Sequence, residues 1–341
     1  MVSDRWKSIA GFVVAIAVLG VLMWLVGFEE VLDALRQADP QIAALTVPVA
    51  ALWLTCWGLA LYLVLGALNA RIAPHRAVFV FVAAVFVNNA TPLGQAGGEP
   101  ISAMFISSAS DSEYETGLAA IASVDTLHFI PSISLAVVGL AYVGLSAIDL
   151  TQNILFAMAG VAVFAAVVPT IGYLAWRSRD RVRRVVATRV TGLLALAGRI
   201  VPRFSPPSRE SVAHRVDGFF EAIGRVATSR KTVLSAMSLS ALGWIFLSTS
   251  LWLSLHALGT TIPFVSILFV VPLGSIAGAT PLPGGLGGLE AAFAALLVPL
   301  GVPTPVAFSA VLIHRGATYW LPTLFGGGAA ALLSVEAKRA G

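Results

Sequence analysis

The chain has 341 residues, of which 58% are hydrophobic and only 11% are charged, and its mean hydropathy is +0.90. Soluble domains carry about 25% charged residues, so this composition excludes a soluble enzyme and predicts an all-α integral membrane protein. The formal net charge is +4, and 13 of the 21 Lys and Arg residues lie between Arg177 and Lys231. In a membrane chain such a cluster indicates a cytoplasmic loop rather than a nucleic-acid surface.

About six segments, taken in chain order, are long and apolar enough to cross a bilayer as helices. Arg5 and Lys7 precede the first of them, and no small-residue cleavage site follows it, so we interpret it as an uncleaved span. The six expected spans are residues 8–28, 41–68, 117–145, 153–176, 233–258 and 305–333.

A short motif occurs twice inside apolar sequence. Residues 88–100 read NNATPLGQAGGEP and residues 278–290 read GATPLPGGLGGLE, so each copy has Ala-Thr-Pro-Leu, a Gly-rich turn and one Glu. A helix cannot run through either copy, because Pro lacks an N–H group and glycines add backbone freedom. Broken helices at corresponding places in two halves indicate a transporter-type site at a repeat interface.

The two copies predict two re-entrant hairpins, at residues 77–109 and 263–300, within one membrane domain. If the basic loop is cytoplasmic, the first hairpin enters from the cytoplasm and the second from outside, so residues 1–176 and 232–341 form an inverted repeat. This topology puts both termini and 19 of the 21 cations on the cytoplasmic side of the cell membrane. The alternative, in which each hairpin crosses fully, fits the segment lengths poorly.

The basic loop, residues 177–231, contains apolar residues that recur at helical spacing. This pattern predicts an amphipathic helix at the membrane surface. The apolar face would consist of Val212, Val216, Phe219, Phe220, Ile223 and Val226.

Glu99 and Glu290 occupy the same place in the two motif copies. With Pro100 after it, Glu99 would sit at the start of a half-helix and could be a cap. A carboxylate at membrane depth is nevertheless costly and usually functional. Asp125 and His128 lie on one face of a span. They suit either a proton-linked or headgroup-binding role, or a structural hydrogen bond between helices.

Arg315 stands about ten residues into the last expected span and therefore needs an anionic partner. That partner is Glu99, Glu290 or Asp125, or else a lipid phosphate. Three acids against one Arg give a net negative cavity. A proton, a cation or a cationic headgroup is then expected to take part.

The glycines of the two motif copies are open to two interpretations. They could expose backbone N–H groups to a phosphate, or they could allow close helix packing through G-x-x-x-G spacing, which we favour. No Walker-type Gly-Lys-Ser/Thr, catalytic Ser elbow or metal-ligand cluster occurs in the sequence, so no catalytic residue, metal or cofactor is predicted.

The combined motifs resemble those of the flippase-like integral membrane proteins, also described as the lysylphosphatidylglycerol synthase transmembrane region. The match runs through Asn88 to Pro100, Pro281 to Glu290, and Arg315 to Pro322. The Asp125–His128 pair departs from the Arg-plus-Asp arrangement of many relatives. The residues we expect to line a headgroup path are Asn88, Asn89, Thr91, Pro92, Gln95, Gly97, Gly98, Glu99, Asp125, His128, Pro281, Pro283, Gly284, Gly285, Gly287, Glu290, Arg315, Tyr319 and Trp320.

The resemblance implies a translocase for a phospholipid or a polyprenyl-phosphate-linked headgroup. In two-domain relatives a soluble aminoacyl-transfer domain makes the lipid, and no such activity is expected here. Membrane lipids, including a lipid-linked glycan or an aminoacyl phospholipid, are the expected partners, and a homo-oligomer is compatible with the sequence. Two alternatives remain: an intramembrane enzyme using Glu99 or Asp125 as general acid/base, and a membrane scaffold docking a partner through the basic loop.

Overall fold

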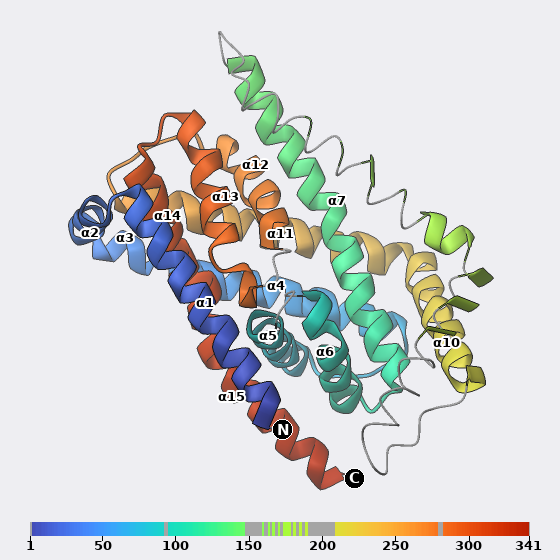
Figure 1. Ribbon diagram of the computed structural model, residues 1–341. Coiled ribbons are helices and arrows are strands. Elements are labelled where there is room, and N and C mark those ends of the chain that lie inside the picture. Colours follow the sequence, from blue (N-terminus) through green and yellow to red (C-terminus); the bar gives the residue numbers. More distant parts are fainter. Residues whose placement is uncertain are drawn as a thin grey trace.

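The computed structural model describes residues 2–91, 95–146, 209–278 and 282–340, together with scattered positions between 159 and 189. Throughout these ranges the chain forms helices joined by turns, with no strand (Figure 1). The all-α prediction is confirmed for this part of the chain. The N- and C-terminal helices end close together at the lower edge of the view.

The helices are named in chain order as in Figure 1. In the first half they are α1 (Val2–Val26), α2 (Phe28–Gln37), α3 (Pro40–Ala44), α4 (Thr46–Ala67), α5 (Pro74–Ala90), α6 (Gln95–Ser110) and α7 (Tyr114–Ser146). They continue with α10 (Arg209–Thr228), α11 (Arg230–Ala257), α12 (Phe264–Ser275), η1 (Ile276–Gly278), η2 (Pro283–Gly285), α13 (Gly288–Leu297), η3 (Val298–Leu300), α14 (Thr304–Arg315), η4 (Gly316–Trp320) and α15 (Leu321–Ala340).

Four of the described segments are long and apolar enough to cross a membrane: Pro40–Ala67, Tyr114–Leu145, Arg230–Ala257 and Pro283–Leu300. The first three match the expected spans 41–68, 117–145 and 233–258. The fourth is expected from the sequence as the return leg of a hairpin, and it consists of the ten-residue α13 between two short 3₁₀ turns. The predicted hairpin topology therefore stays a prediction.

The other expected spans differ in how far the structure describes them. Residues 8–28 form most of α1, of which Ile16–Val26 is a shorter apolar helix. Residues 305–333 are not a plain α-helix, because the five-residue π-helical segment η4 joins α14 to α15. Most of residues 153–176 lie outside the described part of the chain. A π segment inside a helix often marks a functional position, and this one begins directly after Arg315.

The helices of the two halves pack in matching pairs. Helix α4 packs along α11, α5 packs against α15, and α12 packs against α7. The two broken pairs, α5–α6 and α12–α13, thus each place their first helix against a helix of the other half: α5 against α15, and α12 against α7. Within each half, α4–α5–α6–α7 and α11–α12–α13–α14 contact their neighbours in the same order. These contacts between helices of the two halves pack the halves together.

Both motif copies interrupt the helix in which they occur, as predicted. The chain leaves α5 after Ala90 and packs back along it as α6, which requires Gly98 to lie directly against Asn88. The expectation that the second helix begins at Pro100 is wrong, because α6 begins at Gln95 and includes Pro100. The two glycines before Glu99 adopt helical geometry, and the close packing of Gly98 on α5 favours this earlier start.

The amphipathic helix predicted in the basic loop is present as α10. Its buried residues include Ala222 and Val226, and the helix packs mainly against α7, with smaller contacts to α11 and α4. An ion pair of 3.2 Å between Arg215 and Glu115 joins it to the start of α7. The apolar face is therefore covered in part by protein. Residues 190–208 of the loop lie outside the described part.

Candidate functional site

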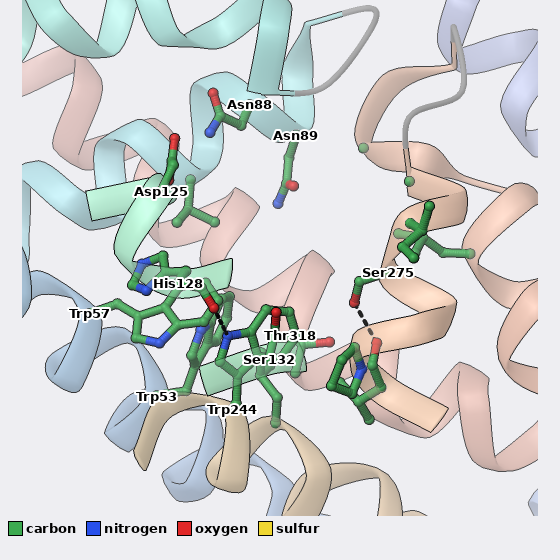
Figure 2. Close-up of a pocket in the computed structure, with 18 of the residues that line it drawn as sticks. Trp53, Trp57, Asn88, Asn89, Asp125, His128, Ser132, Trp244, Ser275 and Thr318 are labelled. Atoms are coloured by element: carbon green, nitrogen blue, oxygen red, sulfur yellow. Dashed lines mark hydrogen bonds between the residues drawn. The ribbon is translucent and has the colours of Figure 1, made fainter. Parts of the chain in front are cut away.

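A cavity of about 610 Å³ lies where the two helix breaks meet (Figure 2). Its walls come from α4, α5, α6 and α7 of the first half and from α11, α12, η1, η2, α13, α14 and η4 of the second. Helix α5 contacts η2 directly, so the tip of the second broken pair reaches the first. Ligand pockets commonly have volumes of about 300–1,000 Å³, so this cavity is large enough for a lipid headgroup.

One end of the cavity is organised by Arg315. Its Nε donates to Glu290 Oε1 at 2.8 Å, and its Nη2 donates to the backbone carbonyl of Gly284, also at 2.8 Å. The Arg315 side chain is 9% exposed and that of Glu290 is 1% exposed, so the pair is removed from solvent. Of the three partners that the sequence allowed for Arg315, the structure selects Glu290. Arg315 also lines the cavity, so this fixed cation is part of the cavity wall.

The backbone of the second motif copy shapes this end. Glu290 accepts a hydrogen bond of 2.6 Å from the backbone N–H of Gly287, so it caps α13 and binds Arg315 at once. Gly284 has a φ of 58°, and a Cβ atom there would lie 2.1 Å from Cε2 of Tyr319. The Arg315 guanidinium lies 4.3 Å from the centre of the Tyr319 ring. Only glycine lets the turn, the ring and the guanidinium stack this closely.

The other end of the cavity is acidic. Glu99 on α6 and Asp125 on α7 both line it, and their carboxyl groups lie within hydrogen-bonding reach of each other. Asn88 and Asn89, in the last turn of α5, lie beside them, as Figure 2 shows for Asn88, Asn89 and Asp125. Asn89 donates a hydrogen bond of 2.9 Å to Thr323 on α15. This hydrogen bond links α5, in the first half, to α15, in the second half.

The two ends occupy matching places in the two halves but differ in charge. Asp125 follows Glu99 by 26 residues, and Arg315 follows Glu290 by 25. Each Glu is thus bound to a polar residue of the fourth helix of its own half. In the second half that residue is a cation and neutralises the Glu. In the first half it is another acid, so the cavity wall contains one acidic cluster and one Arg–Glu ion pair.

Two histidines line the cavity, and α11 orients both. Nδ1 of His128 contacts Ser240 Oγ at 2.7 Å, and Nδ1 of His314 contacts Ser250 Oγ at 2.9 Å. These hydrogen bonds fix the ring orientations. The sequence indicated His128 as a candidate. It gave His314 no role of its own, although His314 stands next to Arg315 in a span.

Three tryptophans form an aromatic part of the cavity wall that was not predicted from the sequence. Trp53, Trp57 and Trp244 line the cavity, and Trp57 stacks on His128 with ring centres 4.0 Å apart (Figure 2). Trp57 donates to the carbonyl of Ser240, and Trp244 to the carbonyl of His128. Their position in the sequence could have indicated a role at a site, because tryptophans favour the ends of spans and these three lie inside spans.

The predicted site residues separate into four groups. Those that line the cavity are Asn88, Asn89, Glu99, Asp125, His128, Gly284 and Arg315. Those in or next to the helix breaks, or behind the lining, are Thr91, Gly97, Gly98, Pro283, Gly285, Gly287, Glu290 and Tyr319. Pro92, Pro281 and the side chain of Gln95 lie outside what the structure describes. Trp320 is 43% exposed and does not line the cavity, because it follows the buried Tyr319 by about 100° around the helix.

Comparison with known proteins agrees with this arrangement. Residues 8–326 match the family described as the lysylphosphatidylglycerol synthase TM region. The chain belongs to this family. A UPF0104 membrane protein of Methanothermobacter thermautotrophicus is 26% identical over 94% of both chains, and one of Pyrococcus horikoshii is 23% identical over 92% of this chain and 94% of its own. The resemblance seen in the motifs is thereby confirmed, and the chain is a multi-pass membrane member of the family.

A further relative has a different name and a longer chain. The glycosyltransferase AglD of Haloferax volcanii is 27% identical over 96% of this chain, which corresponds to 54% of its own length. About half of that protein is therefore similar to nearly all of the present chain.

Proposed function

We propose that the protein is a lipid translocase whose central cavity carries a headgroup across the cytoplasmic membrane while the acyl chains stay in the bilayer. The observation that carries the proposal is Arg315, a buried cation at the meeting point of two broken helix pairs. Nε and Nη2 donate to protein oxygens, so the guanidinium is fixed in place in the wall of the cavity. A pre-oriented guanidinium is a good partner for a lipid phosphate.

The surface around the cavity suits a lipid substrate. Large apolar side chains are exposed on the outer faces of several helices, among them Trp24, Met104, Leu145, Leu234 and Phe325. A cavity that holds a few charged and polar groups and is enclosed by apolar helices lets a headgroup leave water while its chains remain in lipid. Movement would come from one repeat rocking on the other, and the α5–α15 and α12–α7 contacts would be the surfaces that slide.

The relatives suggest which headgroups to test first. The family is described as a lysylphosphatidylglycerol synthase region, and one relative is named a glycosyltransferase. A phospholipid and a polyprenyl-phosphate sugar are therefore the two substrate classes to compare.

The decisive experiment measures lipid movement directly. The full chain is reconstituted into liposomes that contain a fluorescent phospholipid or polyprenyl-phosphate sugar, and dithionite bleaches the outer leaflet. We expect faster loss of the protected fluorescence than in protein-free liposomes, with the lipid chemically unchanged on extraction. A chemically altered lipid would favour the intramembrane enzyme, and no movement of any lipid would favour the scaffold.

The inverted topology makes a separate prediction. In a Cys56→Ala background, Glu113→Cys probes the exposed turn between α6 and α7, and Thr261→Cys probes the exposed turn before α12. We expect an impermeant maleimide to label Glu113→Cys from the cytoplasm and Thr261→Cys from outside, because the two hairpins would enter from opposite faces. Labelling of both sites from the same face would contradict the inverted repeat without bearing on whether lipid moves.

A further inference from the structure

The acidic end of the cavity lacks a balancing charge. The carboxyl groups of Glu99 and Asp125 approach each other, and within the described residues neither forms an ion pair with a Lys, Arg or His. Among the described residues that line the cavity Arg315 is the one Arg, and it is paired with Glu290. Two ionised carboxylates at this separation repel each other unless a cation or a proton lies between them.

Two oxygen atoms at this end are buried without a hydrogen-bond donor. They are Oδ1 of Asn88 and Oδ2 of Asp125. A buried acceptor that is left unpaired costs free energy, and such atoms in native proteins usually have a partner. Among the described residues, no donor reaches either oxygen. A positively charged ligand would satisfy both and would also offset the repulsion between the carboxyl groups.

The three oxygen-bearing side chains come from three helices and line the same cavity. Asn88 lies directly against the backbone at Gly98, since a Cβ atom there would be 2.0 Å from Asn88 Oδ1. Glu99 follows Gly98, and Asp125 reaches Glu99 from α7. Asn88 also belongs to the last turn of α5, which ends at Ala90. The carboxyl end of a helix carries partial negative charge and adds to the attraction for a cation.

The ligand set indicates which cation fits. Two carboxylates and one amide oxygen are hard oxygen ligands, and the described residues hold no group of three or more His, Cys, Asp and Glu side chains that would bind a transition metal. A hydrogen bond between the two carboxyl groups requires that they share one proton, so the set carries one negative charge and suits a monovalent ion. Trp53, Trp57 and Trp244 line the same cavity and would add cation–π attraction for an organic ammonium group.

We propose that Asn88, Glu99 and Asp125 form a subsite for a monovalent cation, supplied either by the ammonium group of the translocated headgroup or by a free Na⁺. The role of this subsite in transport rests on the proposed function, whereas cation binding itself does not. An ammonium group would make the substrate a zwitterionic lipid, with its phosphate toward Arg315. A free Na⁺ would make the subsite the place where an ion gradient acts on the transporter.

Binding is tested first, without lipid movement. The full chain in dodecylmaltoside is titrated with NaCl or with ethanolamine hydrochloride, at constant ionic strength in N-methyl-D-glucamine chloride, and the intrinsic tryptophan fluorescence is recorded. We expect a saturable change with at least one of the two cations, because three of the eight tryptophans line the cavity. Asp125→Asn and Glu99→Gln should each weaken binding about tenfold, as expected when one charged contact is lost.

A matched control uses another acid of the same helix. Glu115 lies at the start of α7, away from the cavity, and pairs with Arg215. Glu115→Gln should bind the cation as the unmodified protein does. Gel filtration of each variant checks that it is folded. If Asp125→Asn elutes as an aggregate, Glu99→Gln gives the same test at the neighbouring carboxylate.

Transport then distinguishes the two sources of the cation. Acyl-labelled phosphatidylethanolamine and phosphatidylglycerol are compared in liposomes, in Na⁺ and in N-methyl-D-glucamine buffer. Faster movement of the ethanolamine lipid in both buffers supports the headgroup ammonium, whereas acceleration of both lipids by Na⁺ supports the free ion. In either case Glu99→Gln/Asp125→Asn should reduce the preference or the acceleration to about one.

Two outcomes would overturn the proposal. One is the absence of saturable binding for both cations. The other is that the double variant Glu99→Gln/Asp125→Asn binds the cation and prefers lipids as the unmodified protein does. Failure of the proposed function is seen separately, because cation binding without movement of any lipid would reject the translocase and keep the subsite.

Discussion

Arg315→Ala is expected to abolish lipid movement and to destabilise the protein severely. The substitution leaves the Glu290 carboxylate, 1% exposed, without its cation. Removing one partner of a buried ion pair typically costs about 3–5 kcal/mol, because the remaining charge has lost both water and its partner. The carbonyl of Gly284 and the face of Tyr319 lose a contact as well. Unfolding by SDS in mixed micelles measures the stability, and the dithionite assay measures movement.

The exposed pair of Arg36 and Asp33 provides a control for this variant. Its two side chains are 73% and 60% exposed, and they lie 3.1 Å apart. Because solvent screens such a pair, Arg36→Ala should change the free energy of unfolding by less than about 1 kcal/mol and should leave lipid movement unchanged. Equal losses for Arg315→Ala and Arg36→Ala would contradict the assignment of Arg315 to a buried site.

The double variant Glu290→Gln/Arg315→Gln separates stability from function. It removes both charges and replaces them by neutral side chains of similar size, so most of the lost stability should return. Lipid movement should stay absent, because no guanidinium faces the cavity. Recovery of movement together with stability would mean that Arg315 is only structural.

The sequence predicted the parts of this site that depend on chemistry at membrane depth. Glu99, Asp125 and Arg315 stood out because a charge in an apolar span is costly unless it has a function or a partner. The two motif copies stood out because Pro and Gly interrupt helices. Both inferences concern single residues or short segments. The free-energy cost of placing them in a membrane can be estimated from the sequence without knowing their contacts.

The parts that the sequence did not predict depend on packing between distant segments. The sequence left Glu99, Glu290, Asp125 and a lipid phosphate open as partners for Arg315. The pairing with Glu290 depends on the turn between η1 and α13, which brings Gly284 to Arg315 and Gly287 to Glu290. The start of α6 was placed five residues late, because the contact of Gly98 with Asn88 is a tertiary contact that local rules for Pro do not contain. In the sequence, Trp57 and Trp244 are indistinguishable from other apolar residues of the spans. Only the packing of α4, α7 and α11 against one another places them at the cavity.

Gly98→Ala is the second substitution with a large expected effect. A Cβ atom at this position would lie 2.0 Å from Oδ1, 2.8 Å from Cα and 2.9 Å from the backbone nitrogen of Asn88. A side chain could rotate away, but the Cα and nitrogen atoms belong to α5, so α5 and α6 would have to separate. Overpacking of this kind costs about 1–3 kcal/mol. The separation would also displace Asn88 and Glu99, and both the cation binding and the lipid movement should fall sharply.

The matched control is Gly66→Ala, near the end of α4, where an added Cβ atom has no neighbour within 4 Å. In that open helical position alanine should raise the stability by up to about 1 kcal/mol, through the loss of backbone freedom in the unfolded chain. The two glycine-to-alanine substitutions should thus change the free energy of unfolding in opposite directions, and this difference tests the geometry of the first helix break. If Gly98→Ala has the same stability and the same rate of lipid movement as Gly66→Ala, then α5 and α6 do not meet at Gly98. The acidic end of the cavity would then not be assembled as described.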